Sequence, residues 1–200
     1  MKIIFATANK GKLREAQEIL GDGYELVSPA MMGIFEDIPE TGKTLEENSF
    51  QKASYLHERS SMGCFADDTG LEVVALGGAP GVYTARYAGG DGHDFDANMD
   101  KLLRELEGVT GRRARFRSVV TLMLPGETKV FEGILEGEIA LSKAGCGGFG
   151  YDPVFIPDSL PGGAPNTARL TLAEIGEEAK NSISHRGKAL RSMAAYLSGR

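Results

Sequence analysis

Cysteine is scarce in this chain of 200 residues, which contains two cysteines and no tryptophan. Cys64 and Cys146 show neither the paired spacing of a zinc site nor the density of a disulfide framework. Their scarcity excludes the class of small disulfide-stapled domains. We therefore expect a reduced, cytoplasmic protein.

Basic residues are fewer than acidic ones, 22 Lys and Arg against 28 Asp and Glu, which gives a formal net charge of −6. Proteins that coat nucleic acid need clustered Lys and Arg side chains, so this balance argues against a nucleic-acid polymer as partner. The apolar run at residues 1–6 is too short for a signal peptide or a membrane span, and we expect no membrane partner. Apolar residues make up 42% of the chain and charged residues 25%, which predicts one well-cored globular domain over residues 1–200.

The N-terminal residues have the pattern of a strand, a short loop and a helix. Residues 2–6 are apolar enough for a buried strand, and apolar side chains recur at helical spacing from Leu13 to Leu20. Between them, Thr7, Asn9 and Lys12 offer hydrogen-bonding groups and a positive charge at a helix N-terminus, which favours a phosphate. Six residues alone fit a capped helix start with a solvated lysine equally well.

The next helix is expected over residues 45–59. Thr44 and Glu47 have the spacing of a capping box at its start. The preceding Thr-Gly-Lys-Thr at residues 41–44 mimics the end of a Walker A motif, but Asp37 stands where the first glycine is required. We therefore interpret residues 35–42 as an acidic, irregular connection and reject the nucleotide-binding P-loop.

This helix carries a polar stripe at positions i, i+4 and i+7, formed by Asn48, Lys52 and Tyr55. Such a stripe is usually a solvated face. Since it begins just after the acidic connection, Lys52 could instead face a binding cleft.

Two adjacent carboxylates, Asp67 and Asp68, interrupt the apolar stretch from Cys64 to Val74. Taken alone, Asp-Asp-Thr-Gly is typical of a β-turn. On a strand, neighbouring side chains point to opposite faces, so only one of the two would face the core.

The stretch from Gly145 to Gly150 satisfies the pattern G-x-G-x-x-G. A dinucleotide site requires a helix directly afterwards, and Pro153 and Pro157 flank an extended apolar run instead. We reject dinucleotide binding and expect a flexible backbone that presents Phe149, Tyr151 and Asp152 to a flat ring. Residues 158–169 are rich in Pro and Gly and predict a mobile loop.

The remaining pattern completes an α/β chain. An amphipathic helix is expected after Asp94, and residues 114–124 and 129–141 predict two strands joined as a hairpin at Pro125-Gly126-Glu127. A terminal amphipathic helix is expected after His185-Arg186. A His-Arg pair is more often structural than functional, but its neighbours in the motif order favour a functional role.

Four patches now occur in an order that resembles the inosine triphosphate pyrophosphatase family. They are Thr7-x-Asn9-x-x-Lys12, the stretch from Pro39 to Gly42, Ala66-Asp67-Asp68-Thr69-Gly70-Leu71 with Gly77-Gly78-x-Pro80-Gly81, and the stretch from Phe149 to Pro153 with Ser184-His185-Arg186. Each patch alone is weak, but four in register along nearly the whole chain make the resemblance specific.

The resemblance implies a two-lobed α/β fold, with a long twisted mixed sheet flanked by helices and the active site in a central cleft. It also implies a homodimer that hydrolyses ITP, dITP and XTP to the monophosphate and pyrophosphate. Mg²⁺ is the implied cofactor, and Mn²⁺ is a plausible substitute. The cellular role would be to remove non-standard purine nucleotides from the nucleotide pool.

Residue roles follow from the same resemblance. Asp68 matches the proton acceptor, and Glu40 and Asp68 match the carboxylates that hold the metal. The residues matched to substrate binding are Thr7, Ala8, Asn9, Lys10, Gly11, Lys12, Lys52, Thr69, Phe149, Gly150, Tyr151, Asp152, Lys180, His185 and Arg186. A carboxylate on Mg²⁺ is a poorer base, so the sequence leaves open whether Asp67 shares the role of Asp68.

Base selectivity has a physical basis in Arg186. Inosine and xanthosine present an acceptor oxygen at C6, whereas adenosine presents an amino donor there. Arginine only donates, so it would bond the former and clash with the latter.

The chain differs from the family pattern at two places, and two alternative assignments compete with this one. The family often has Trp where this chain has Tyr151, and the loop at residues 159–169 is longer than the family suggests. A Maf-like nucleotide pyrophosphatase is the nearest rival, and His185-Arg186 argues against it. A nucleotide-sensing module is the other, and the clustered carboxylates Glu40, Asp67 and Asp68 argue against binding without a metal.

Overall fold

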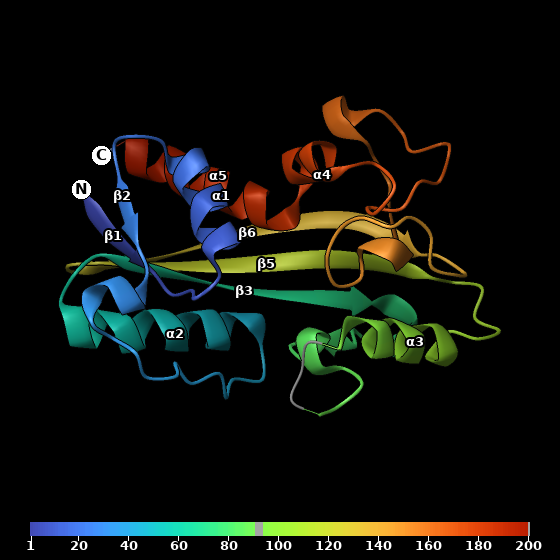
Figure 1. Cartoon of the computed structure of the whole chain (residues 1–200), viewed down its shortest axis with the longest axis horizontal. Helices are drawn as coiled ribbons and strands as arrows, with labels where there is room; N and C mark the ends of the chain where they lie inside the picture. Colours follow the sequence, from blue (N-terminus) through green and yellow to red (C-terminus); the bar gives the residue numbers. More distant parts are fainter. Residues whose placement is uncertain (91–93, 200) are drawn as a thin grey trace. The chain divides into compact units, whose positions relative to one another are not determined.

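The computed structural model describes residues 1–90 and 94–199. It confirms an α/β fold with a mixed sheet flanked by helices (Figure 1). The strands are β1 (Lys2–Phe5), β2 (Glu25–Val27), β3 (Cys64–Val73), β4 (Pro80–Gly81), β5 (Arg113–Leu124), β6 (Glu127–Ile139) and β7 (Phe155–Pro157). The α-helices are α1 (Lys10–Leu20), α2 (Leu45–Ser60), α3 (Phe95–Glu105), α4 (Glu177–Ile183) and α5 (His185–Ser198).

The sheet has the hydrogen-bonded order β2-β1-β3-β5-β6-β7, with β4 paired to β3 off this path. Strand β1 runs parallel to both β2 and β3, whereas β3–β4 and β6–β7 are antiparallel. The expected hairpin is confirmed, because β5 and β6 are adjacent and the two residues between them include Gly126 at φ 78°.

The described chain divides into two compact units. Unit 1 comprises Met1–Asp68, Ser118–Gly133 and the segment from His185 onward, and unit 2 comprises Thr69–Arg117 and Ile134–Ser184. That these units act as two lobes of one domain around a cleft stays a prediction.

In unit 1 the sheet buries both faces. Ile3, Phe5 and Phe65 point toward α1 and α5, where Leu20 and Leu190 complete the core cluster. The alternate residues of the same strands pack with the apolar side of α2. Figure 1 shows α2 on one side of β3, and α1 and α5 on the other. Strand periodicity therefore sends neighbouring β3 side chains to different helices.

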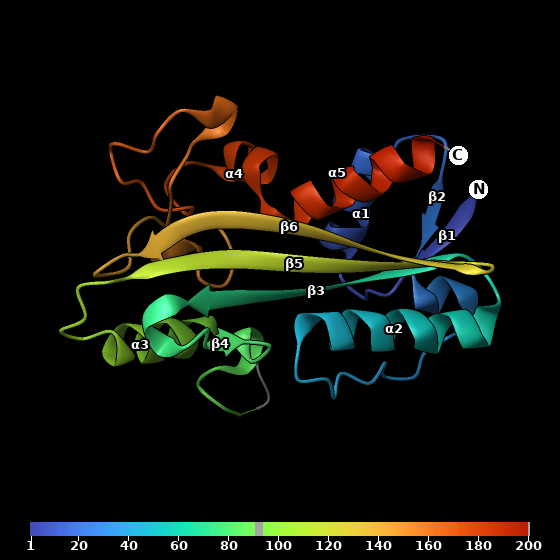
Figure 2. The same cartoon turned by 180° about the vertical axis from the view of Figure 1, so that it is seen from behind.

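Unit 2 is built around the helix expected after Asp94. The Asp94 side chain accepts a hydrogen bond from Ala97 N and caps α3, and Met99, Leu102 and Leu106 are buried as the spacing predicts. Figure 2 shows α3 and α4 on opposite sides of the strands of this unit.

The glycine-rich stretch before β7 does not lead into an α-helix. A single 3₁₀ turn at Asp152–Val154 is followed directly by β7, so the rejection of a dinucleotide fold is confirmed. The loop at 158–169 is more structured than the predicted mobile loop. Ser159 and Pro165 form a β-bridge, and the buried Asn166 amide donates to Pro157 O and Leu170 O.

Candidate active site

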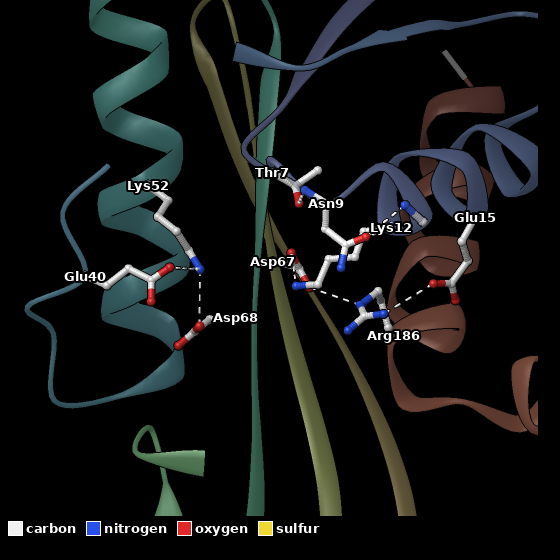
Figure 3. Close-up of polar contacts among 10 residues, drawn as sticks. Thr7, Asn9, Lys12, Glu15, Glu40, Lys52, Asp67, Asp68 and Arg186 are labelled. Atoms are coloured by element: carbon white, nitrogen blue, oxygen red, sulfur yellow. Dashed lines mark hydrogen bonds and ion pairs between the residues drawn. The ribbon is translucent and has the colours of Figure 1, made fainter. Parts of the chain in front are cut away.

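Strand β3 decides the geometry of the two adjacent carboxylates. It runs without a break through Asp67 and Asp68, which excludes the β-turn interpretation. Strand β1 ends at Phe5, opposite Phe65, so β3 continues past the end of its parallel neighbour. Figure 3 shows the two side chains on opposite sides of β3, Asp68 toward α2 and Asp67 toward α1 and α5.

Asp67 is the anchor of an ion network on the α1 and α5 side. Its side chain is 2% exposed and accepts from Lys12 Nζ at 2.9 Å and from Arg186 Nε at 3.1 Å. Arg186 Nη1 also donates to Glu15 Oε2 at 3.3 Å. Burial raises the pKa of Asp67, but the charges of Lys12, Arg186 and Lys52 outweigh it and hold that pKa well below its usual range.

This network bears on two alternatives that the sequence leaves open. An Asp67 carboxylate that is committed to two cations, with a depressed pKa, is a poor proton acceptor. Lys12 is not the solvated lysine of the alternative interpretation, because it pairs with Asp67 across the sheet edge.

The helix start at α1 is nevertheless capped as that alternative proposed. The Asn9 side chain accepts from Gly11 N at 2.8 Å and from Lys12 N at 3.2 Å, and Thr7 Oγ1 accepts from Asn9 N. The loop is thus held in a fixed shape while Lys10 and Ala8 stay exposed. The capped helix start is therefore confirmed, and phosphate binding by this loop stays a prediction.

Lys52 organises the carboxylates on the α2 side. Its ammonium lies 2.8 Å from Glu40 Oε1 and 3.2 Å from Asp68 Oδ1, and the residue is only 7% exposed (Figure 3). Burial lowers the pKa of Lys52, but the negative charges of Asp68, Asp67 and Glu40 together outweigh this effect. The net result is a raised pKa, so the side chain stays protonated. Two members of the polar stripe, Asn48 and Lys52, are therefore buried rather than solvated, and Tyr55 is half-buried.

Asp68 has the opposite electrostatics to Asp67. Burial raises its pKa, Lys52 lowers it, and Glu40 raises it again, with a net increase. Its Oδ2 accepts from Asn48 Nδ2 at 3.1 Å.

Asn48 is a site residue that sequence reasoning placed only in a stripe. It is 1% exposed, donates to Asp68 and accepts from Gly42 N at 2.7 Å. It therefore connects Asp68 to the segment that carries Glu40. The sequence feature that could have identified Asn48 is its position four residues before Lys52, on the same face of the helix.

Gly42 shows why a glycine follows Glu40 in the second motif. A Cβ there would lie 2.6 Å from Glu47 Cβ and 2.9 Å from Asn48 N. The segment packs so closely on the first turn of α2 that a side chain has no room. Thr44 is confirmed as the N-cap of α2, since its Oγ1 accepts from Glu47 N. Glu47 accepts from Lys43 N, one residue before the cap, so the return bond of the predicted capping box is shifted by one residue.

The second group of predicted residues lies in unit 2 and is described by itself. Asp152 is buried, accepts from Phe149 N at 2.5 Å and pairs with Lys180 of α4. Phe149 is 62% exposed, whereas the Tyr151 ring is buried and its hydroxyl donates to Thr84 O at 2.9 Å. The structure thus supports Phe149, and not Tyr151, as a ring on which a base could stack.

Three other predicted residues are chain neighbours of residues described above. Thr69 follows Asp68 on β3, Gly150 adopts φ 66° beside Phe149, and His185 begins α5 next to Arg186. Arg186 is held by two carboxylates, and its contact with a base oxygen stays a prediction.

Comparison with known proteins gives consistent matches along the whole chain. A model of the Ham1 family matches residues 3–196. A dITP/XTP pyrophosphatase of Flavobacterium johnsoniae is 46% identical over 98% of each chain. One of Bacillus subtilis is 44% identical over 97% of this chain and 96% of its own.

Solved structures of the same family are also similar. The Staphylococcus aureus Ham1 protein aligns with a TM-score of 0.89 and 38% identity, covering 100% of this chain and 99% of its own. A HAM1 protein from Coxiella burnetii aligns with a TM-score of 0.90 and 35% identity over the full length of both chains.

Proposed function

Since the chain belongs to the Ham1 family, we propose that it is a pyrophosphatase of non-standard purine nucleoside triphosphates. Its substrates would be dITP, ITP and XTP, and its products the monophosphate and pyrophosphate. The names of the full-length relatives support the substrate class. The resemblance to the inosine triphosphate pyrophosphatase family is thereby confirmed at the level of the family.

The observation that carries the proposal is the buried Lys52 ammonium between Glu40 and Asp68. A buried cation flanked by two carboxylates offers both a phosphate-binding charge and two hard oxygen ligands in one place. A triphosphate brings several negative charges, which a lysine and a metal ion together can offset.

Glu40 and Asp68 fit a magnesium ion. Mg²⁺ binds through one or two carboxylates plus substrate phosphates and retained waters, rather than through an all-protein cage. Within residues 1–90 and 94–199, no group of three or more His, Cys, Asp or Glu side chains is placed to hold a metal ion. When bound, Mg²⁺ would supply positive charge that polarises the phosphate oxygens.

The side chains of unit 1 then have distinct roles. Lys12, the capped loop at its side and Lys52 would bind the phosphates, and Asp68 would accept the proton of the attacking water. The water oxygen forms a bond to the α-phosphorus, the bond to the bridging oxygen breaks, and pyrophosphate leaves with that electron pair. Asp67 stays ionised and holds Lys12 and Arg186.

In unit 2, Phe149 would stack on the base, and Asp152 with Lys180 would give the pocket hydrogen-bonding groups.

We further expect a cytoplasmic homodimer. No helix in the described part of the chain is long and apolar enough to span a bilayer.

The test is pyrophosphate release from dITP, ITP, XTP, GTP and ATP, with and without Mg²⁺. Fast, Mg²⁺-dependent turnover of the first three and slow turnover of GTP and ATP would support the proposal. Glu40→Gln should lose activity, whereas its matched control Glu36→Gln, an exposed carboxylate in the same connection, should not. Equal rates on all five nucleotides would refute the base preference, and tight binding without turnover would favour the sensing module.

A further inference from the structure

The segment from Lys143 to Gly150 carries the exposed Phe149 ring but has no helix or strand of its own. It contains four glycines, and Gly145 and Gly148 adopt φ of 82° and 88°. Glycine lowers the cost of many backbone conformations, so such a segment does not fix a side chain by itself. The orientation of the ring must come from contacts with other elements.

Two such contacts come from the first turns of α3. The rings of Phe95 and Phe149 have centroids 4.3 Å apart and planes inclined by 62°, an edge-to-face pair. At the other end of the segment, Lys143 Nζ lies 2.9 Å from Asp96 Oδ1 and 2.8 Å from Asp100 Oδ1. Helix α3 therefore holds the glycine-rich segment at both of its ends.

Helix α3 is itself firmly attached within unit 2. Asn98 is 1% exposed, accepts from Ala88 N at 2.6 Å and donates to Ala85 O at 3.1 Å. Met99 and Leu102 are buried in the core of the unit. Phe95 is thus a ring on a helix anchored in the core of the unit, and it faces a ring on a glycine-rich segment without helix or strand.

From this arrangement we propose that Phe95 is a positioning residue that holds Phe149 in the orientation that accepts a purine base. The inference rests on the proposed function, because it concerns the same base-binding ring. Phe95 itself is placed to act through Phe149 and is not assigned a contact with the substrate. Edge-to-face aromatic pairs stabilise by an amount equivalent to about a two- to twelvefold change in an equilibrium constant.

The experiment compares two competitive inhibitors that differ in the base. Inosine monophosphate carries the base, whereas inorganic pyrophosphate lacks it. In Phe95→Ala, the inhibition constant of inosine monophosphate should rise about two- to twelvefold, and that of pyrophosphate should stay within about twofold of wild type. Phe95→Tyr keeps the ring edge and should behave like wild type.

A double-mutant cycle tests whether Phe95 acts through Phe149. Phe149→Ala should raise the inhibition constant of inosine monophosphate, and adding Phe95→Ala to it should have no further effect. Phe50→Ala, an exposed phenylalanine on α2, is the matched control and should change neither inhibitor. If Phe95→Ala fails to fold, Phe95→Leu keeps most of the apolar volume and should show the same selective loss.

The outcomes separate the two proposals. An unchanged inosine monophosphate constant in Phe149→Ala would overturn the base platform and the role of Phe95 with it. A raised constant in Phe149→Ala together with an unchanged one in Phe95→Ala would overturn the role of Phe95 alone. Equal losses for both inhibitors, or additive effects in the cycle, would show a general structural role instead.

Discussion

Replacing Asp67 with asparagine should strongly destabilise the protein, because Asp67 neutralises two cations from a buried position. Its side chain is 2% exposed and lies 2.9 Å from Lys12 Nζ and 3.1 Å from Arg186 Nε. Removing one partner of a fully buried ion pair costs about 3–5 kcal/mol. The side chains of Lys12 and Arg186 retain 28% and 23% exposure, so they recover part of their hydration. We therefore expect a loss of about 2–3 kcal/mol.

The assay is urea unfolding without nucleotide, where this loss corresponds to a midpoint shift of about 1 M. Two variants serve as controls. Glu15→Gln removes one bond of 3.3 Å to Arg186 and should cost less than about 1 kcal/mol. Asp68→Asn removes a charge that burial and Glu40 already disfavour, so stability should change by at most about 1 kcal/mol. The same variant should abolish activity, because Asp68 is the proposed proton acceptor.

The pH dependence has a defined sign. The pKa of Asp67 is lower in the folded protein than its ordinary value of 3.8, so its stabilising contribution is complete above that value and is lost as pH falls through the folded pKa. The difference in unfolding free energy between wild type and Asp67→Asn should stay constant from about pH 8 to 5 and narrow below pH 3.8. A loss below about 1 kcal/mol at pH 7, or a difference that grows in acid, would refute the network as a source of stability.

Three further predictions concern other parts of the chain. Gly42→Ala should lower the unfolding midpoint by an amount equivalent to about 1–3 kcal/mol, because its Cβ would lie within 2.6–2.9 Å of atoms of α2; an unchanged thermal melt would contradict that packing. A thiol reagent should titrate one cysteine of the native protein, the exposed Cys146, and a second only after unfolding, since burial raises the pKa of Cys64 to about 12. Lys180→Met leaves the buried Asp152 without its cation and should raise KM for ITP about tenfold or more, measured by initial rates; unchanged kinetics would remove this pair from the nucleotide site.

The local elements of this protein were predictable because their signals are local. The N-cap at Thr44, the apolar spacing of α3 and the hairpin at Gly126 are all confirmed. Alternation along a strand also predicted that Asp67 and Asp68 would face opposite sides. The prolines after Gly150 correctly excluded a dinucleotide-binding helix.

The assignment of partners depended on the tertiary structure. Whether Asp67 or Asp68 has a proton affinity suited to a base depends on which cations lie nearby, and those come from α1, α2 and α5, up to 119 residues away in the sequence. Burial likewise separated Phe149 from Tyr151, two aromatic residues with the same sequence neighbourhood. The sequence by itself determined the family and most of the helices and strands, and it named most of the candidate residues. Only the folded chain decided how charge and burial are distributed among them, because both depend on distances between segments that sequence spacing does not contain.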